Sequence, residues 1–206
     1  SAECRFVAWP RGAEGLFLSW AFGLGCVART MVTLAQLRST FAGPGRLVWI
    51  GLRPGQGQPM QVVSRVNVLG GRGLEGDRKA FRSGGERQVT LFQHEHLAVL
   101  ASLMGREAVE PEAMRRNLAV SGINVLALRA RRFAIGAQLF EGTGYCAPCR
   151  RMEETLGRGG FNASRGHGGI TARALSDGWI AIGDGVTPSG PDGARGDDES
   201  DEPTFV

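Results

Sequence analysis

The chain has 206 residues, of which 42% are hydrophobic and 21% are charged. These ordinary values exclude a wholly disordered chain, a collagen and a multi-span membrane protein. The formal net charge is +4, although residues 187–206 hold six acidic residues against one basic residue. Residues 1–186 are therefore strongly basic and attract anionic ligands. Because it contains no helix-turn-helix, zinc finger or aromatic-rich basic strand, we do not expect a nucleic-acid partner.

Residues 1–45 are predicted to form an N-terminal extension that differs from the rest of the chain. An apolar run of 14 residues, 15–28, follows Arg5 and Arg11 and resembles the apolar region of a signal peptide. It is too short to span a bilayer as a helix, so we expect no membrane association. A second interpretation makes Met31 the natural start and residues 1–30 an upstream segment. We expect a cytoplasmic protein, with export as the alternative if residues 1–28 are a working signal.

The middle of the chain, residues 46–186, is predicted to be a single domain of short strands and few short helices. Hydrophobic patterning and turn residues predict strands at 47–50, 61–69, 89–92, 117–120 and 137–141. They predict helices at 94–104, 111–114 and 149–156. Two apolar runs around Ser176-Asp177-Gly178 predict a hairpin over 170–182. With 32 glycines, this pattern favours a mainly β, barrel-like (β-rich α+β) domain over a doubly wound sheet.

Residues 187–206 are rich in Pro, Gly, Ser and acidic side chains. Such a segment buries too little apolar surface to offset the entropy lost on ordering, so we expect a disordered tail.

The clearest chemical motif is the pair Cys146 and Cys149, separated by Ala147-Pro148. This spacing suits a redox disulfide, half of a four-cysteine zinc site, or one working thiolate with a neighbour. The zinc site lacks a second pair, since the other cysteines, Cys4 and Cys26, lie in the N-terminal extension. A thioredoxin-like role needs a strand-helix-strand context that the chain does not provide here.

Cys149 is predicted to stand at the start of a helix, beside two arginines at 150 and 151. Helix N-termini and nearby positive charges both stabilise a thiolate, so the motif favours reactive cysteines over buried structural ones. His167 lies in the Gly-rich segment Arg165-Gly166-His167-Gly168-Gly169 and is a candidate to bind a ligand or to set the charge state of the thiol. A surface loop histidine is the equally weighted alternative.

The glycine-rich loop 70–78 resembles loops whose backbone N–H groups bind anions. It lacks the Gly-Lys-Ser/Thr ending of a nucleotide-binding P-loop, so ATP is not implied. Guanidinium groups suited to phosphate or carboxylate are nearby in sequence, at Arg78, Arg82, Arg87, Arg115 and Arg116. Asn117, which precedes a predicted strand, is a candidate to bind a ligand or to fix a turn.

A series of segments, taken in order, resembles a known family. They are Ile50-Gly51-Leu52-Arg53-Pro54, Gly73-Leu74-Glu75-Gly76-Asp77-Arg78, Arg87-Gln88-Val89-Thr90-Leu91-Phe92, Arg116-Asn117-Leu118-Ala119-Val120-Ser121-Gly122-Ile123, Ile135-Gly136, the segment 144–149, Gly166-His167-Gly168-Gly169-Ile170-Thr171-Ala172-Arg173 and Ile182-Gly183-Asp184-Gly185-Val186. The order is similar to that of the MOSC domain, named for the C-terminal domain of molybdenum cofactor sulfurases, in its small stand-alone bacterial type.

The resemblance implies a barrel-like fold and either molybdenum-pterin (molybdopterin) cofactor binding or a role in sulfur transfer. In the family an essential cysteine carries sulfur or ligates molybdenum, and by position Cys149 matches it, with Cys146 as the extra cysteine. Arg78, Arg116 and Asn117 match positions expected near the pterin phosphate. Certain relatives reduce N-hydroxylated compounds, so a sulfur transferase and a molybdenum-dependent reductase both remain open.

Two departures from the family pattern limit these expectations. Lys79 stands where the family often has His, and no aminotransferase-like domain with a pyridoxal lysine or ferredoxin domain is attached. A cysteine desulfurase or an electron-donor protein, if used, is therefore a separate partner. The alternative functions are a non-catalytic molybdopterin carrier and a thiol-disulfide protein that uses both cysteines. The sequence leaves the oligomeric state open.

Overall fold

The computed structural model describes residues 32–189 of the chain. The signal-like run, the alternative start at Met31 and most of the predicted acidic tail lie outside these residues. By its contacts the chain divides after Val32, and the fold described below belongs to the second unit. It begins with a short helix α1, Leu34–Ser39, which buries no residue and is capped by the hydroxyl of Thr33.

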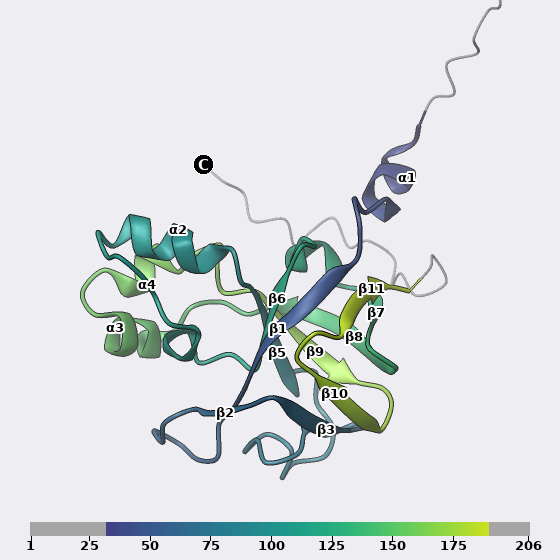
Figure 1. The fold of residues 1–206 in the computed structure, drawn as a ribbon, viewed down its shortest axis with the longest axis horizontal. Helices are drawn as coiled ribbons and strands as arrows, with labels where there is room; N and C mark the ends of the chain where they lie inside the picture. The colour runs from purple at the N-terminus through teal and green to yellow at the C-terminus, as the bar shows by residue number, and fades with distance from the viewer. Residues whose placement is uncertain (1–31, 190–206) are drawn as a thin grey trace, which may run out of the picture. The chain divides into compact units, whose positions relative to one another are not determined.

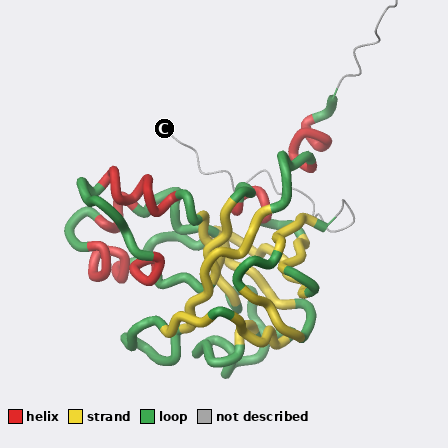
Figure 2. The backbone as a smooth tube through the Cα atoms, viewed as in Figure 1, coloured by secondary structure: helices red, strands yellow, loops and turns green. Residues whose placement is uncertain are grey.

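A closed β-barrel forms the body of the domain (Figures 1 and 2). Its seven strands run in the order β11-β7-β8-β9-β5-β6-β1, and a β1–β11 pairing closes the ring. These strands are β1 Gly45–Leu52, β5 Val89–Gln93, β6 Leu118–Ser121, β7 Arg132–Ile135, β8 Gln138–Tyr145, β9 Ile170–Ala174 and β11 Gly185–Pro188. All of these pairs are antiparallel except β5–β6, which is parallel. The mainly β, barrel-like fold expected from the sequence is thus confirmed.

A second, three-stranded sheet runs in the order β10-β3-β4. Its strands are β3 Arg65–Leu69, β4 Gly73–Leu74 and β10 Gly178–Ala181, while β2, Gln61–Val63, extends the barrel sheet beside β1. The predicted strand 61–69 is therefore two strands in different sheets. They separate at Ser64, whose carbonyl oxygen accepts a hydrogen bond from the N–H of Ile182.

The hairpin predicted over 170–182 is wrong. Strand β9 pairs with β5 and β8 in the barrel, whereas β10 pairs with β3 in the second sheet. The polar residues between them bond to strand β8 and to the residue that follows β3 instead of closing a tight turn. Ser176 Oγ accepts a hydrogen bond from the N–H of Leu139, and Asp177 Oδ1 accepts one from the N–H of Gly70. These two hydrogen bonds fix the segment that passes from the barrel sheet to the second sheet.

The helices gather at one side of the barrel, where α2, α3 and α4 lie close together in Figure 1. Their bounds are α2 His96–Leu103, α3 Arg150–Leu156 and α4 Gly160–Ala163, with 3-10 turns η1 Pro111–Met114 and η2 Val125–Leu128. The predicted helices at 94–104 and 149–156 are thus present with shorter bounds, and the one predicted at 111–114 is the 3-10 turn η1 with the same bounds. Sequence patterning missed α1, β4, β7, β11, η2 and α4.

Two apolar clusters stabilise the domain. The larger fills the barrel with inward side chains such as Leu47, Leu91 and Phe140, each fully buried. The second lies between the barrel and the helices and joins Trp49 and Phe92 to Leu100 of α2 and Met152 of α3. This second cluster holds α3, and with it the residues just before α3, against the wall of the barrel. Burial of an apolar side chain of this size contributes about 1.5–3 kcal/mol.

No helix within residues 32–189 has the length and apolar character needed to cross a membrane.

Candidate functional site

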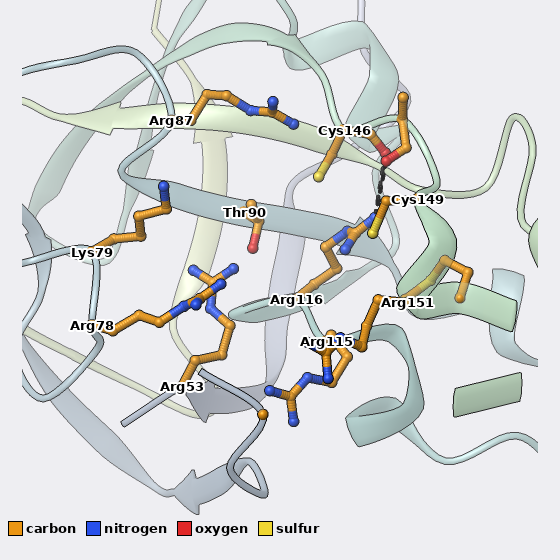
Figure 3. A pocket seen from close by; sticks show the side chains of 13 residues that line it. Arg53, Arg78, Lys79, Arg87, Thr90, Arg115, Arg116, Cys146, Cys149 and Arg151 are labelled. Atoms are coloured by element: carbon orange, nitrogen blue, oxygen red, sulfur yellow. Dashed lines mark hydrogen bonds between the residues drawn. The ribbon is translucent and has the colours of Figure 1, made fainter. Parts of the chain in front are cut away.

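A pocket of about 390 Å³ opens where the barrel meets the helices, and both cysteines of the predicted motif line it (Figure 3). Its walls come from the chain after β1, the loop between β4 and β5, strand β5, the η1–β6 connection, the β8–α3 connection and the start of α3. The lining residues are Arg53, Gly57, Arg78, Lys79, Arg87, Thr90, Arg115, Arg116, Cys146, Ala147, Cys149, Arg151 and Met152. Four separate stretches of the chain, residues 53–57, 78–90, 115–116 and 146–152, thus converge on one cavity.

The pocket is strongly positive, because seven of its lining residues are basic and none is acidic. Burial lowers the pKa of Arg115, and the charges of Arg151, Arg53 and Arg78 lower it further. An arginine stays protonated despite such a shift. Three positive charges around Arg115 thus contribute to the shift, after burial. A site of this kind favours a ligand with phosphate or carboxylate groups.

One wall of the pocket rests on a buried network around Asp77. The carboxylate of Asp77 accepts hydrogen bonds from Nε and Nη2 of Arg53 at 2.9 and 3.2 Å, and from the N–H of Arg53 at 3.0 Å. Burial alone raises the pKa of Asp77, but the hydrogen bonds and charge of Arg53, with the N–H of Lys79, lower it overall. Asp77 thus stays ionised and fixes the position of Arg53.

Asn117 completes this network and does not line the pocket. Its Oδ1 accepts hydrogen bonds from Arg53 Nη2 at 2.7 Å and from the hydroxyl of Thr90 at 2.9 Å, and its Nδ2 donates to Asp77 Oδ2 at 2.7 Å. The side chain is fully buried, so the protein itself uses the amide. The structure thus places Asn117, a candidate cofactor-binding residue by sequence, in a supporting position behind Arg53.

Arg116 connects the cysteine loop, residues 146–149, to the rest of the site. Its Nε donates to the carbonyl oxygen of Gly168 at 3.1 Å, and its Nη1 donates to that of Met114 at 3.1 Å. Its Nη2 lies 3.5 and 3.4 Å from the carbonyl oxygens of Cys146 and Ala147. Carbonyl oxygens, rather than a carboxylate, surround this buried guanidinium within residues 32–189. Arg116 therefore leaves its positive charge at the pocket while it holds the backbone of the motif.

The two cysteines differ in exposure. Cys146 is buried, with 5% of its surface exposed, and its N–H donates to the carbonyl oxygen of Gly169. Cys149 is exposed and stands at the N-cap of α3. Both are free thiols. In Figure 3 the sulfur of Cys146 points toward the middle of the cavity, and Cys149 lies beside Arg116 at the edge.

His167 lies next to this loop but is not among the residues that line the pocket. Its ring packs edge-on against His96 of α2, with 4.5 Å between ring centroids. Nδ1 of each imidazole is buried without a hydrogen-bond partner. Burial lowers the pKa of His96, as does the charge of His167, while Glu95 opposes them. The segment around His167 reaches the site through Gly168, where an added Cβ would collide with the carbonyl oxygen of Cys146.

The structure brings most of the sequence candidates together. Cys146, Cys149, Arg78, Arg87, Arg115 and Arg116 line one pocket, whereas Asn117 and His167 do not. Sequence reasoning missed Arg53, Lys79, Thr90 and Arg151 as pocket residues and Asp77 as their support. For Arg53 and Asp77 one signal was available, since both belong to segments that match the family pattern. A lone arginine in a chain with 23 of them otherwise carries little information.

The donor set fits an anionic group better than a metal held by protein ligands alone. Within residues 32–189, no group of three or more His, Cys, Asp or Glu side chains could hold a metal ion. The pocket instead offers guanidinium groups, which bind phosphate, beside thiols, which are soft donors for a metal such as molybdenum. A phosphorylated cofactor that brings its own metal fits this arrangement.

The family comparison agrees with this fold. The sequence profile of the MOSC domain matches residues 76–187, more than half of the chain. The chain therefore belongs to the MOSC domain family, which is linked to proteins associated with the molybdenum cofactor. A search of curated proteins finds no significant match.

Several solved structures share the fold. The YUAD protein from Bacillus subtilis is 19% identical, with a TM-score of 0.59 over 71% of this chain and 97% of that one. YiiM from Geobacillus stearothermophilus is 16% identical, with a TM-score of 0.58 over 71% and 76% of the two chains. YiiM from Escherichia coli is 17% identical, with a TM-score of 0.54 over 70% of each chain. At these identities the similarity establishes the fold alone.

Proposed function

We propose that this protein binds a molybdenum-pterin cofactor in the basic pocket and uses Cys149 as its working thiol. The observation that carries the proposal is the presence of both cysteines in a cavity lined by seven basic residues and no acidic one. Family membership supports the choice of cofactor. The guanidinium groups of Arg78, Arg87 and Arg115 hold the cofactor phosphate, since Arg offers planar paired donors to phosphate oxygens.

Cys149 is preferred over Cys146 because its side chain is exposed at the pocket, whereas Cys146 is buried. An exposed thiol is accessible both to a cofactor and to a protein that delivers sulfur. Arg116 holds the carbonyl groups of Cys146 and Ala147 and so fixes the loop that presents Cys149. In this proposal His167 does not contact the ligand. It supports the site through its neighbour Gly168, whose carbonyl oxygen accepts a hydrogen bond from Arg116.

The thiol has two possible uses. In one, Cys149 ligates molybdenum, and the bound metal centre supplies the redox chemistry that reduces an N–O bond with electrons from a separate donor protein. In the other, the Cys149 thiolate attacks the terminal sulfur of a persulfide on a separate cysteine desulfurase. That attack forms the Cys149 persulfide and releases the desulfurase thiolate, so one sulfur atom moves without net oxidation. Both uses need a reduced thiol, which fits a cytoplasmic location.

The test is to measure molybdenum and pterin in protein purified from a bacterial host that makes the cofactor. Wild type is compared with Cys149→Ser, with Cys146→Ser as the matched control. Near-equal molybdenum and pterin in wild type, with metal lost only in Cys149→Ser, supports ligation by Cys149. Cofactor absent from wild type, with a persulfide detected on Cys149 by mass spectrometry, supports sulfur carriage. Wild-type protein with neither refutes the proposal.

Two alternatives make different predictions in the same experiment. A non-catalytic carrier, favoured by the dominance of basic contacts in the pocket, keeps metal and pterin together in Cys149→Ser. A thiol-disulfide protein, favoured by the two free cysteines in one cavity, shows a measurable Cys146–Cys149 redox couple. Such a protein loses activity on removal of either cysteine. A silent Cys146→Ser variant rules out the thiol-disulfide alternative.

A further inference from the structure

We propose that Cys146 is a second sulfur-carrying residue, which takes the sulfur from Cys149 and holds it inside the pocket. This inference rests on the sulfur-transfer form of the proposed function and assigns its second step. Both cysteines are free thiols, and both line the pocket. Cys149 accounts for the uptake of sulfur from a partner protein, but it leaves the second thiol without a role.

The two thiols differ in what can reach them. Cys149 is exposed at the edge of the cavity, where a protein that delivers sulfur has access to it. Cys146 has only 5% of its surface exposed, and its sulfur points toward the middle of the cavity (Figure 3). A partner protein therefore reaches Cys149 first, whereas Cys146 faces the space that the basic residues surround. Sulfur on Cys149 has to move inward to reach a ligand in that space, and Cys146 is the thiol that faces it.

The spacing of the pair brings its sulfur atoms within reach of each other. Cysteines separated by two residues, here Ala147 and Pro148, can close a disulfide, so a persulfide on one is accessible to the other. The persulfide also lengthens the Cys149 side chain by one S–S bond of about 2 Å. The backbone of the accepting residue is held in place, because the N–H of Cys146 donates to the carbonyl oxygen of Gly169 at 2.9 Å. The terminal sulfur on Cys149 is therefore presented to a thiol on a fixed backbone.

The transfer step exchanges one S–S bond for another. The Cys146 thiolate attacks the terminal sulfur of the Cys149 persulfide, a bond forms between Cys146 Sγ and that sulfur, and its bond to Cys149 Sγ breaks. Cys149 leaves as a thiolate and takes up the proton that the Cys146 thiol lost, so one sulfur atom moves without net oxidation. The positive charges of Arg116 and Arg151, which line the same pocket, stabilise the thiolate before and after the step. Burial then protects the persulfide on Cys146 from thiols in solution, which remove sulfur from an exposed persulfide.

The experiment treats the full chain with glutathione persulfide and follows the sulfur by mass spectrometry of the alkylated peptide that contains both cysteines. In wild type the persulfide should appear first on Cys149 and then on Cys146, as Cys149 loses it. In Cys149→Ser the persulfide on Cys146 should form at least about tenfold more slowly, because a buried thiol is poorly accessible to the donor. In Cys146→Ser the persulfide should stay on Cys149 and be removed rapidly by an added thiol reductant. Cys4→Ser removes a cysteine of the N-terminal extension and is the control, which should behave as wild type.

The outcomes separate this inference from the proposed function, and the wild-type time course decides it even where a variant fails to fold. A wild-type persulfide that stays on Cys149 overturns the second step and leaves Cys149 as the sulfur carrier. A Cys146–Cys149 disulfide with release of sulfide also overturns it, because the attack then falls on the inner sulfur. Undiminished labelling of Cys146 in Cys149→Ser overturns the order of the two thiols. Absence of persulfide from both cysteines of wild type refutes the sulfur-transfer form of the proposed function together with this inference.

Discussion

Arg53 Nη2 donates a hydrogen bond of 2.7 Å to Oδ1 of Asn117, a side chain that never reaches the pocket surface. The same amide oxygen accepts from the N–H and the hydroxyl of Thr90. Thr90 of β5 and Arg53, which follows β1, are thereby both held by Oδ1 of Asn117. A buried amide thus sets the position of a charged side chain that faces the ligand.

Asn117→Ala should destabilise the protein by about 2–4 kcal/mol, because it leaves buried donors on Arg53 and Thr90 without their acceptor. Urea unfolding, monitored by the fluorescence of the tryptophans, measures the change. Asn162→Ala, at an exposed position of α4, is the control and should change stability by less than about 0.5 kcal/mol. Equal stability of the two variants would contradict the supporting role of Asn117.

Asp77→Asn should cost about 3–5 kcal/mol, since removing one partner leaves the buried charge of Arg53 uncompensated. Glu154→Gln, which breaks exposed pairs with Arg150 and Arg151, should cost less than about 1 kcal/mol. The pKa of Asp77 is lowered on folding. The contribution of the Asp77 carboxylate to the free energy of unfolding is therefore complete above the unfolded pKa of about 3.9. This contribution is lost as pH falls through the lower pKa of the folded state. The thermal unfolding temperature of wild type should therefore fall as the pH drops through this range, and that of Asp77→Asn should lack this fall.

Arg116→Lys should also be destabilising, by about 1–3 kcal/mol, although charge is conserved. A single ammonium group cannot reach the carbonyl oxygens of Gly168, Met114 and the cysteine loop at once, as the guanidinium does. Arg150→Lys provides the matched comparison, because the side chain of Arg150 is 93% exposed. The two variants are compared by urea unfolding. A wild-type midpoint for Arg116→Lys would show that its hydrogen bonds do not hold the loop.

The pairing of His96 with His167 predicts a pH dependence near neutrality. The pKa of His96 is lowered on folding, first by burial and then by His167. The unfolded chain therefore binds a proton more readily, and stability falls as pH drops below the unfolded value of about 6.5. Urea midpoints at pH 7.5 and 5.5 measure the loss. His96→Gln should reduce the difference between them, whereas His94→Gln, at an exposed position, should preserve it.

The exposures of the two cysteines predict different reactivity. In the native protein iodoacetamide should modify Cys149 first, and Cys146 should react only slowly until the protein is unfolded. Fragmentation of the peptide that contains both residues shows which one carries the label, and Cys4 and Cys26 fall in other peptides. Faster labelling of Cys146 would mean that the thiol pointing into the cavity is the accessible one, and would move the proposed role to it.

Local patterning predicted much of this protein correctly. Short β-rich segments, frequent glycines and few helical stretches identified a barrel-like domain, because strand and turn preferences act over a few neighbouring residues. The helix after Cys149 was predicted for the same reason. The hairpin at 170–182 was wrong, since the side chains of Ser176 and Asp177 bond to Leu139 and Gly70, which are distant in sequence.

For the site, too, the sequence determined one part and the tertiary structure another. The sequence by itself determined which chemistry was available: two cysteines in close spacing, an excess of arginine and a family pattern that orders them. Only the tertiary structure decided which arginines face the cysteines, that Asn117 stands behind Arg53, and that His167 packs on His96. The reason is that the strand order of the barrel places β6 between β5 and β1. The contacts between their ends depend on strand order and register, which no local pattern encodes.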